Sequence, residues 1–124
     1  MLRLLKLRAK EENVEERIEL ILGALWDPRL PAGKVDLILC ADVYHEFSHP
    51  ELMLAAMRKS LSPKGEVVLL EFREEDPKVP IKPLHKMSKK QVLKEMKQND
   101  FELTREFDGL PWQHMMFFGK DDAE

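Results

Sequence analysis

The sequence predicts an α/β domain whose sheet is mostly parallel and ends in an antiparallel strand pair. Residues 35–43 and 66–72 are short, β-rich apolar runs of the kind found in parallel sheets buried on both faces. A helical pattern separates them, as a parallel connection requires. Residues 101–107 and 112–118 are two further strand-like runs, and the connection between them is so short that they must run antiparallel. The alternation of helices and strands is that of an α/β domain.

At the N-terminus, residues 1–13 predict a helix, since apolar residues fall at helical spacing and neither glycine nor proline interrupts them. Residues 17–23 predict a strand with alternate apolar positions, which Gly23 ends. Residues 24–34 contain two prolines and a glycine and predict a loop.

The central helix is expected to start near Ser48 and to run to about Leu61. Ser48 and Glu51 have the spacing of a capping box, and Pro50 falls in the first turn, where its missing N–H costs nothing. Residues 62–65 predict a turn.

A long charged and proline-rich loop is expected over residues 73–87. A helix over residues 88–99 should follow it, and Ser88 with Gln91 repeats the spacing of the capping box.

Composition limits the classes of function. The chain has 124 residues and a net charge of −3, which fits one domain or part of a larger one, without a global attraction to nucleic acid or to anionic membranes. Its single cysteine, Cys40, rules out an internal disulfide and fits a reducing, cytoplasmic location. We find neither a signal peptide nor a membrane-spanning run. A lysine-rich stretch over residues 82–97 is interrupted by Glu95 and lacks interleaved aromatic residues, so a solvated helix face is favoured over nucleic-acid binding.

Residues 45–49, H-E-F-S-H, match the H-E-x-x-H zinc-protease motif. A zinc site of that class needs both histidines on one helix, whereas His45 follows a predicted strand and the helix begins only near His49. We therefore expect no metal here. In open parallel sheets, ligands bind outside the carboxyl ends of strands, and His45 lies at such an end.

A family resemblance becomes specific at residues 35–72. The apolar V-D-L-I strand, the Y-H-E-F loop, the helix, the P-K-G turn and the next apolar strand resemble the middle of a class I S-adenosylmethionine-dependent methyltransferase. Residues 17–39 resemble that family's third strand and the loop after it, and the C-terminal pair resembles its sixth and seventh strands. The resemblance implies a partial Rossmann-like methyltransferase sheet. In the family, the strand order is third, second, first, fourth, fifth, seventh, sixth.

Two parts of the family pattern have no counterpart in this chain. The family's glycine-rich turn after the first strand is absent, because the five glycines lie far apart in the sequence. The acidic residue that ends the second strand is absent as well. We therefore expect residues 1–124 to be a single domain that resembles roughly the C-terminal three-fifths of a methyltransferase domain, a truncated chain with impaired cofactor binding. The fourth strand would then form an exposed apolar edge, which residues 17–23 would cover or through which two chains would pair as a homodimer.

Site residues follow from the resemblance position by position. It implies that Gly23, Leu25 and Asp27 lie on the adenine side of the cofactor, although Asp27 could equally be a turn residue and Leu25 a core or lid residue. It implies that the backbone around Cys40 and Ala41 faces the amino-acid part of S-adenosylmethionine and that Asp42 points toward cofactor or substrate. We expect the Cys40 side chain to be a small buried apolar residue rather than a nucleophile, because nothing nearby in the sequence would activate it.

Catalytic roles are implied for His45 and Tyr44, with His45 as a base near neutral pH, although orientation alone can suffice for methyl transfer. Glu71 and Arg73 would lie on the substrate side, and residues 73–87 could form a lid. The resemblance thus implies methyl transfer to an unidentified, small-molecule acceptor. The alternative is a non-catalytic, methyltransferase-like interaction module.

Overall fold

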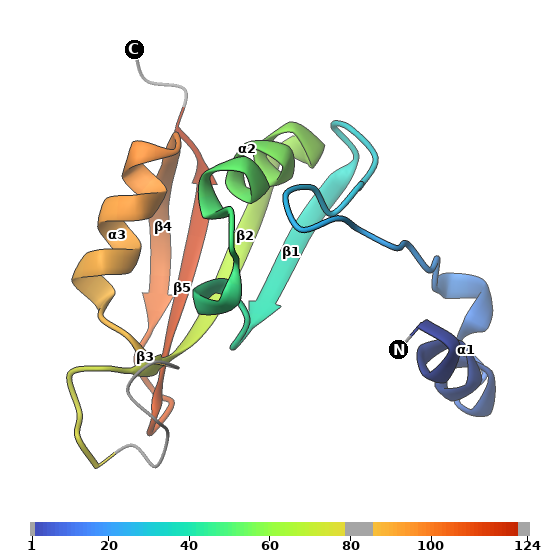
Figure 1. Ribbon diagram of the computed structural model, residues 1–124, viewed down its shortest axis with the longest axis horizontal. Coiled ribbons are helices and arrows are strands. Elements are labelled where there is room, and N and C mark those ends of the chain that lie inside the picture. The colour runs from blue at the N-terminus through green and yellow to red at the C-terminus, as the bar shows by residue number, and fades with distance from the viewer. Residues whose placement is uncertain (1, 79–85, 122–124) are drawn as a thin grey trace.

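The computed structural model describes residues 2–78 and 86–121, which form a mixed α/β structure (Figure 1). Within this part of the chain, the helices are α1 (Leu2–Glu11), α2 (Pro50–Ser60) and α3 (Lys89–Gln98), with short 3₁₀ turns η1 (Glu15–Arg17) and η2 (Tyr44–Glu46). The strands are β1 (Val35–Ala41), β2 (Leu61–Arg73), β3 (Lys86–Met87), β4 (Phe101–Phe107) and β5 (Gln113–Lys120).

The strands form one sheet in the order β1, β2, β5, β4, and the short β3 pairs with the end of β2. β1 and β2 are parallel, whereas β5 runs antiparallel to both β2 and β4. This order is the fourth, fifth, seventh and sixth strands of the implied methyltransferase sheet. The predicted fold class is therefore confirmed as a partial Rossmann-like sheet with an antiparallel C-terminal pair.

The hydrophobic core lies between one face of this sheet and the helices α2 and α3. Leu54 and Met57 of α2 and Val92 and Met96 of α3 are buried against alternate residues of the strands. On the sheet side, the buried contributors are Cys40, Leu61, Val67, Leu69, Phe101, Met116 and Phe118. Period-two alternation in the strands and helical spacing in α2 and α3 therefore converge on one core.

The opposite face of β1 is open to solvent. Leu37 and Leu39 are 57% and 59% exposed, and β1 pairs with β2 alone among the described strands. The prediction that this strand is buried on both faces is wrong for the described residues, because none of them covers the side chains of Leu37 and Leu39. The expectation that residues 17–23 cover its edge is also wrong, since no β1 pairing involves them.

Residues 17–23 do not form the predicted strand. The segment leaves η1 and continues without regular structure to an isolated bridge between Ala24 and Asp27. A strand requires a hydrogen-bonding neighbour, and in the implied order the third strand pairs with the second, for which the chain has no counterpart. Figure 1 shows α1 standing apart from the sheet, at the far end of this extended segment.

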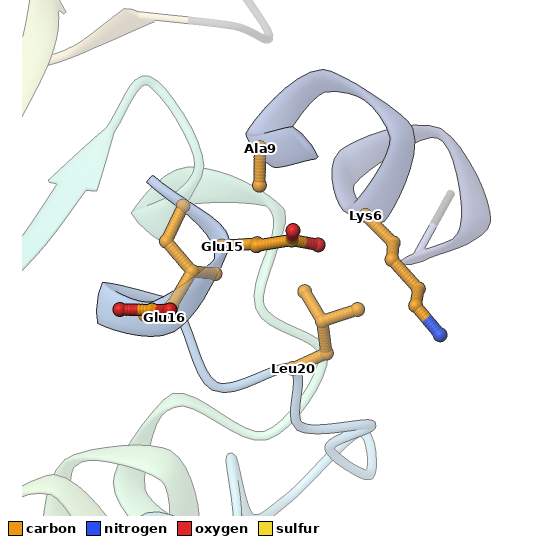
Figure 2. A pocket seen from close by; sticks show the side chains of 6 residues that line it. Lys6, Ala9, Glu15, Glu16 and Leu20 are labelled. Carbon is orange, nitrogen blue, oxygen red and sulfur yellow. The ribbon is translucent and has the colours of Figure 1, made fainter. Parts of the chain in front are cut away.

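A hollow of about 230 Å³ lies within this N-terminal region (Figure 2). It is lined by Lys6 and Ala9 of α1, by Glu15 and Glu16 of η1 and by Leu20. Ile18 completes its lining, and the hollow contains none of the predicted site residues.

Helix boundaries differ from the predictions at one of the two capping boxes. α2 begins at Pro50 after His49, which makes no side-chain cap, so the predicted Ser48–Glu51 box does not form. The Ser48 side chain stands one residue too early to reach the first helical amides. At α3, by contrast, the Ser88 hydroxyl accepts from the Gln91 amide at 3.1 Å, as predicted.

Two loop predictions are modified. Residues 62–65 fall within β2, but the pairing jumps there from Val35–Leu61 to Leu37–Glu66, so the predicted turn is a bulge in the strand. The predicted 73–87 loop contains β3, and its residues 79–85 lie outside the described part of the chain. In the part that is described, we find no helix with the length and apolar character needed to cross a membrane.

Candidate functional site

The predicted site residues after β1 lie where the parallel strands β1 and β2 end side by side. Asp42 follows β1 with φ of 57°, a conformation that non-glycine residues adopt mainly in tight turns. Its amide donates to the Leu70 carbonyl at 2.8 Å. Its carboxylate accepts two hydrogen bonds from Nε2 of Gln113, at 2.8 and 2.6 Å. The turn at the end of β1 is therefore fixed from β2 and from β5.

His45 and Glu71 form a close polar pair at this rim. The His45 amide donates to Oε1 of Glu71 at 2.9 Å, and the imidazole Nδ1 lies 2.7 Å from Oε2. The Glu71 side chain is fully buried, and that of His45 is 7% exposed. One carboxylate thus fixes both the backbone and the ring of the histidine that follows β1.

The surroundings of Glu71 favour its protonated form over the carboxylate. Burial raises the pKa of Glu71; the contacts with His45 act in the opposite direction, and the charge of Asp42 adds to the increase. The net direction is upward. A buried acid with a raised pKa beside a histidine, at the end of a parallel strand, is typical of functional sites.

Tyr44 connects the rim to α3. Its hydroxyl donates to Oε1 of Glu95 at 2.7 Å, and Nε2 of Gln91 donates to Oε2 of the same carboxylate at 2.7 Å. Burial raises the pKa of Tyr44, and the hydrogen bond to Glu95 raises it further. Tyr44 therefore remains a neutral hydroxyl across the physiological range, and it is placed to orient η2 rather than to act as a phenolate.

Cys40 is buried in the core face of β1. Burial, with a further contribution from Glu71, raises the pKa of its thiol to about 11. A thiol of this kind is a poor nucleophile at neutral pH. The sequence prediction that Cys40 is a small buried apolar residue is confirmed, whereas the cofactor contact implied for the backbone at Cys40 and Ala41 stays a prediction.

A pocket of about 280 Å³ opens beside His45. It lies between η2, the segment after β2 and the first turns of α3. Its walls include Tyr44, Phe47, Glu74, Met87 and Glu95.

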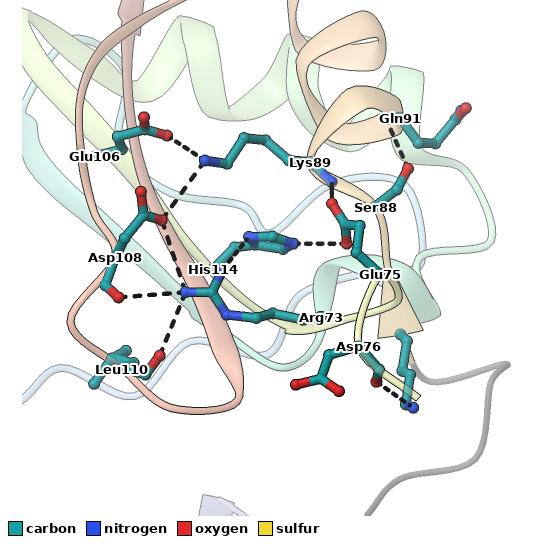
Figure 3. A network of polar contacts seen from close by, with 11 residues as sticks. Arg73, Glu75, Asp76, Ser88, Lys89, Gln91, Glu106, Asp108, Leu110 and His114 are labelled. Carbon is teal, nitrogen blue, oxygen red and sulfur yellow. Dashed lines mark hydrogen bonds and ion pairs between the residues drawn. The ribbon is translucent and has the colours of Figure 1, made fainter. Parts of the chain in front are cut away.

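A second polar network lies next to this pocket (Figure 3). Nε2 of His114 is 3.0 Å from Oε1 of Glu75, whose other oxygen accepts from the Lys89 amide at 3.0 Å. Arg73 donates to the Leu110 carbonyl at 3.3 Å, and the Lys89 ammonium lies 2.9 Å from Glu106. The network ties the end of β2, the start of α3 and the β4–β5 hairpin together.

The residues implied for the adenine side lie apart from the rim. Asp27 accepts from the Arg29 amide at 2.7 Å, the geometry of a local turn, and Leu25 is 68% exposed. Gly23 lies against the backbone of Asp27 and Pro28. No hydrogen bond among the described residues joins this group to Cys40, Ala41 or Asp42. Their cofactor roles stay predictions.

The zinc interpretation has no structural support in residues 2–78 and 86–121. His45 belongs to η2 and His49 precedes α2, so the two do not share a helix. No group of three or more potential ligands in those residues could hold a metal ion.

Sequence reasoning missed the His45–Glu71 partnership, although it placed both residues near the crevice. A usable signal was present: Glu71 interrupts an otherwise apolar strand. A carboxylate in a buried strand requires a partner, and the nearest polar candidate is the loop after the adjacent strand.

Comparison with known proteins relates this chain to methyltransferases. A family model described as "Methyltransferase domain" matches residues 1–69. A search of curated protein sequences found no match.

Several solved structures share the fold. An SAM-dependent methyltransferase from Aquifex aeolicus superposes with a TM-score of 0.80 at 16% identity, over 90% of this chain and 58% of that protein. The mitomycin 7-O-methyltransferase MmcR has a TM-score of 0.82 at 13% identity, over 96% and 39%. The trans-methyltransferase CalH, solved with SAH, has a TM-score of 0.76 at 17% identity, over 97% and 40%. The chain thus spans less than two thirds of the length of each of these proteins.

Proposed function

This chain belongs to the methyltransferase domain family, and we propose that it forms the C-terminal part of an S-adenosylmethionine-dependent methyltransferase acting on a small-molecule acceptor. The observation that carries the proposal is the His45–Glu71 pair, which stands at the carboxyl ends of β1 and β2 beside a pocket. That is the place where open α/β sheets bind their ligands.

The described residues fit only one part of the cofactor. Ala41 is exposed at the rim, and hydrogen bonds hold the Asp42 turn beside it, so we propose that this side binds the amino-acid portion. None of the five glycines provides the close-packed turn that the family uses for backbone contacts. We therefore propose that these 124 residues alone bind S-adenosylmethionine weakly, and that tight binding needs the remainder of the sheet.

His45 is the proposed proton acceptor. With Glu71 ionised, Nδ1 carries the proton shared with Oε2, and the lone pair lies on Nε2, which is 3.8 Å from Oε1 of Glu46. An acceptor hydroxyl in the neighbouring pocket would pass its proton to Nε2 while a lone pair of its oxygen takes the methyl group. The bound cofactor would supply that methyl group and leave as the thioether. An ammonium acceptor would first have to give its proton to Nε2, and its nitrogen lone pair would then take the methyl group. Glu71 positions the ring and stabilises the imidazolium that forms. Tyr44 is a positioning residue, since its hydroxyl is bonded to Glu95.

NMR spectroscopy of the ¹⁵N-labelled chain tests both the proposed cofactor contact and the proposed role of the His45–Glu71 pair. We expect millimolar S-adenosylmethionine to shift the amides of Ala41 and Asp42. Asp42→Asn should weaken this response, whereas Asp36→Asn, at the opposite end of β1, should leave it unchanged. An absent response would contradict the cofactor assignment, and micromolar affinity by calorimetry would contradict the weak binding.

The imidazole ¹⁵N shifts of the same sample report the tautomer of His45. In the unmodified chain we expect Nδ1 to be protonated. In Glu71→Gln, the amide can still accept from the His45 backbone while its NH₂ group donates to Nδ1, so the proton should move to Nε2. A tautomer that does not respond would remove Glu71 from its proposed role.

A second candidate is a non-catalytic interaction module that pairs with a second copy through β1. The exposed outer face of Leu37 and Leu39 favours it, because open apolar strands recruit partners. Its test is the self-association experiment described below.

A further inference from the structure

The pocket beside His45 is small and formed mainly by side chains whose positions are fixed. Its volume of about 280 Å³ is at the lower end of ligand sites, which suits a molecule of about one ring. Phe47, Pro50 and Met87 supply an apolar wall. The Phe47 ring packs edge-to-face on Tyr44, with ring centroids 5.7 Å apart. This wall would accept the hydrocarbon body of a ligand.

The charge of the lining is predominantly negative. Among the described residues, the carboxylates of Glu74 and Glu95 line the pocket together with one ammonium group, that of Lys86. The Lys86 ammonium donates to the Asp76 carbonyl at 3.3 Å, next to a further acid. The Tyr44 hydroxyl stays neutral and leaves the charge of the lining unchanged. Carboxylates at the walls of a low-dielectric pocket favour cations and oppose anions.

The pocket wall is also held in place before any ligand arrives. The Glu74 amide donates a hydrogen bond to the Met87 carbonyl at 3.4 Å. The next residue, Glu75, anchors this segment through the Lys89 amide and His114 (Figure 3). Burial opposes ionisation, but these contacts hold the pKa of Glu75 below its usual value, so it stays ionised at neutral pH. A preformed wall spares the ligand the cost of ordering it.

We infer that the methyl acceptor is a small organic cation, an amine with an apolar or aromatic body. Its ammonium group would lie toward Glu74 and Glu95, its body against Phe47 and Met87, and its reacting group toward His45. The Tyr44 ring, whose hydroxyl is bonded to Glu95, would add a favourable cation–π contribution. The inference rests on the proposed function, because that function makes this pocket the acceptor site.

Three ligands that share a phenol ring but differ in charge test the inference: tyramine, p-cresol and 4-hydroxyphenylacetate. Binding to the full chain is measured by NMR titration without cofactor. We expect tyramine to bind at least tenfold more tightly than 4-hydroxyphenylacetate, with p-cresol between them, and to shift the resonances of Phe47 and Met87. Equal affinities, or tighter binding of the anion, would overturn the inference.

Glu74→Gln should reduce the preference for tyramine several-fold, because Glu74 is exposed at the pocket and its loss leaves the core intact. Glu51→Gln, on the exposed face of α2, is the matched control and should keep the full preference. An unchanged preference in Glu74→Gln would remove this carboxylate from the site. Since cofactor is absent, failure here is distinguishable from failure of the S-adenosylmethionine titration.

Discussion

β1 and β2 are adjacent parallel strands with similar apolar sequences, yet their surroundings differ sharply. Leu39 of β1 pairs with Val68 of β2. Leu39 is 59% exposed, whereas Val68 is 2% exposed. β2 has a strand on each side, whereas β1 has only one among the described residues. An apolar strand sequence therefore indicates that the strand needs to be buried. Whether the described residues bury it depends on the position of the strand in the sheet.

Truncating one leucine on each strand should give the largest contrast. Leu69→Ala in β2 removes a side chain that is fully buried in the core, and it should lower the free energy of unfolding by roughly 2–5 kcal/mol. Leu39→Ala should cost less than about 1 kcal/mol, because its side chain is already largely in water. Urea denaturation at low protein concentration measures both.

The m-value provides the control for this pair. If both variants keep the m-value of the unmodified chain, the midpoints can be compared directly. Similar losses at the two positions would mean that Leu39 is covered in solution, and the contrast between the strands would be lost.

Cys40 places a titratable group on the covered face of β1. Burial raises the pKa of its thiol from the ordinary value near 9.0 to about 11. The folded state therefore resists ionisation that the unfolded chain undergoes. The resulting stabilisation is complete below about pH 9 and is lost as the pH rises toward about 11. Roughly 2–3 kcal/mol should disappear across this interval.

The contribution of the Cys40 thiol to the free energy of unfolding is isolated by comparing the unmodified chain with Cys40→Ala from pH 8 to pH 11. The difference in unfolding free energy between the two should shrink as the pH rises. Tyr44 is present in both proteins, and its pKa is raised mainly by burial and by Glu95, with Cys40 as the smallest cause, so most of its contribution to the unfolding free energy cancels. A pH-independent difference would show that the core face of β1 is open to water.

Local sequence patterns predicted most of the fold. The apolar runs that became β1 and β2, the C-terminal hairpin and the Ser88 cap all depend on interactions within a few residues or between neighbouring strands. The strand predicted for residues 17–23 does not form, because it needs a neighbouring strand that the described residues do not supply. The capping box predicted for Ser48 does not form, because the helix begins at Pro50 and the cap position therefore falls at His49.

The candidate site was predictable in location but not in its pairings. The rule for open sheets placed Asp42, Tyr44 and His45 at the crevice. The partners Gln113, Glu95 and Glu71 lie 71, 51 and 26 residues away in sequence, respectively. Such contacts depend on strand order and on the register between β2 and β5, which a single sequence does not specify.

Charging the open face of β1 should have the smallest effect on folding and should separate the two proposed functions. If two copies pair through β1, the dimer population should rise with concentration. The double variant Leu37→Lys, Leu39→Lys should then raise the dissociation constant at least tenfold, or about 1.4 kcal/mol, because charges on an edge strand block pairing. Sedimentation velocity over a range of concentrations measures this.

Leu52→Lys, at a comparably exposed position on α2, controls for added charge and should dimerise normally. A monomer at every concentration would exclude the second copy as the partner of β1. The homodimer would then be withdrawn, and the remaining source of cover for Leu37 and Leu39 would be the rest of a methyltransferase sheet. Those two leucines should in that case become protected when such a segment is supplied, whereas Leu69 should not change.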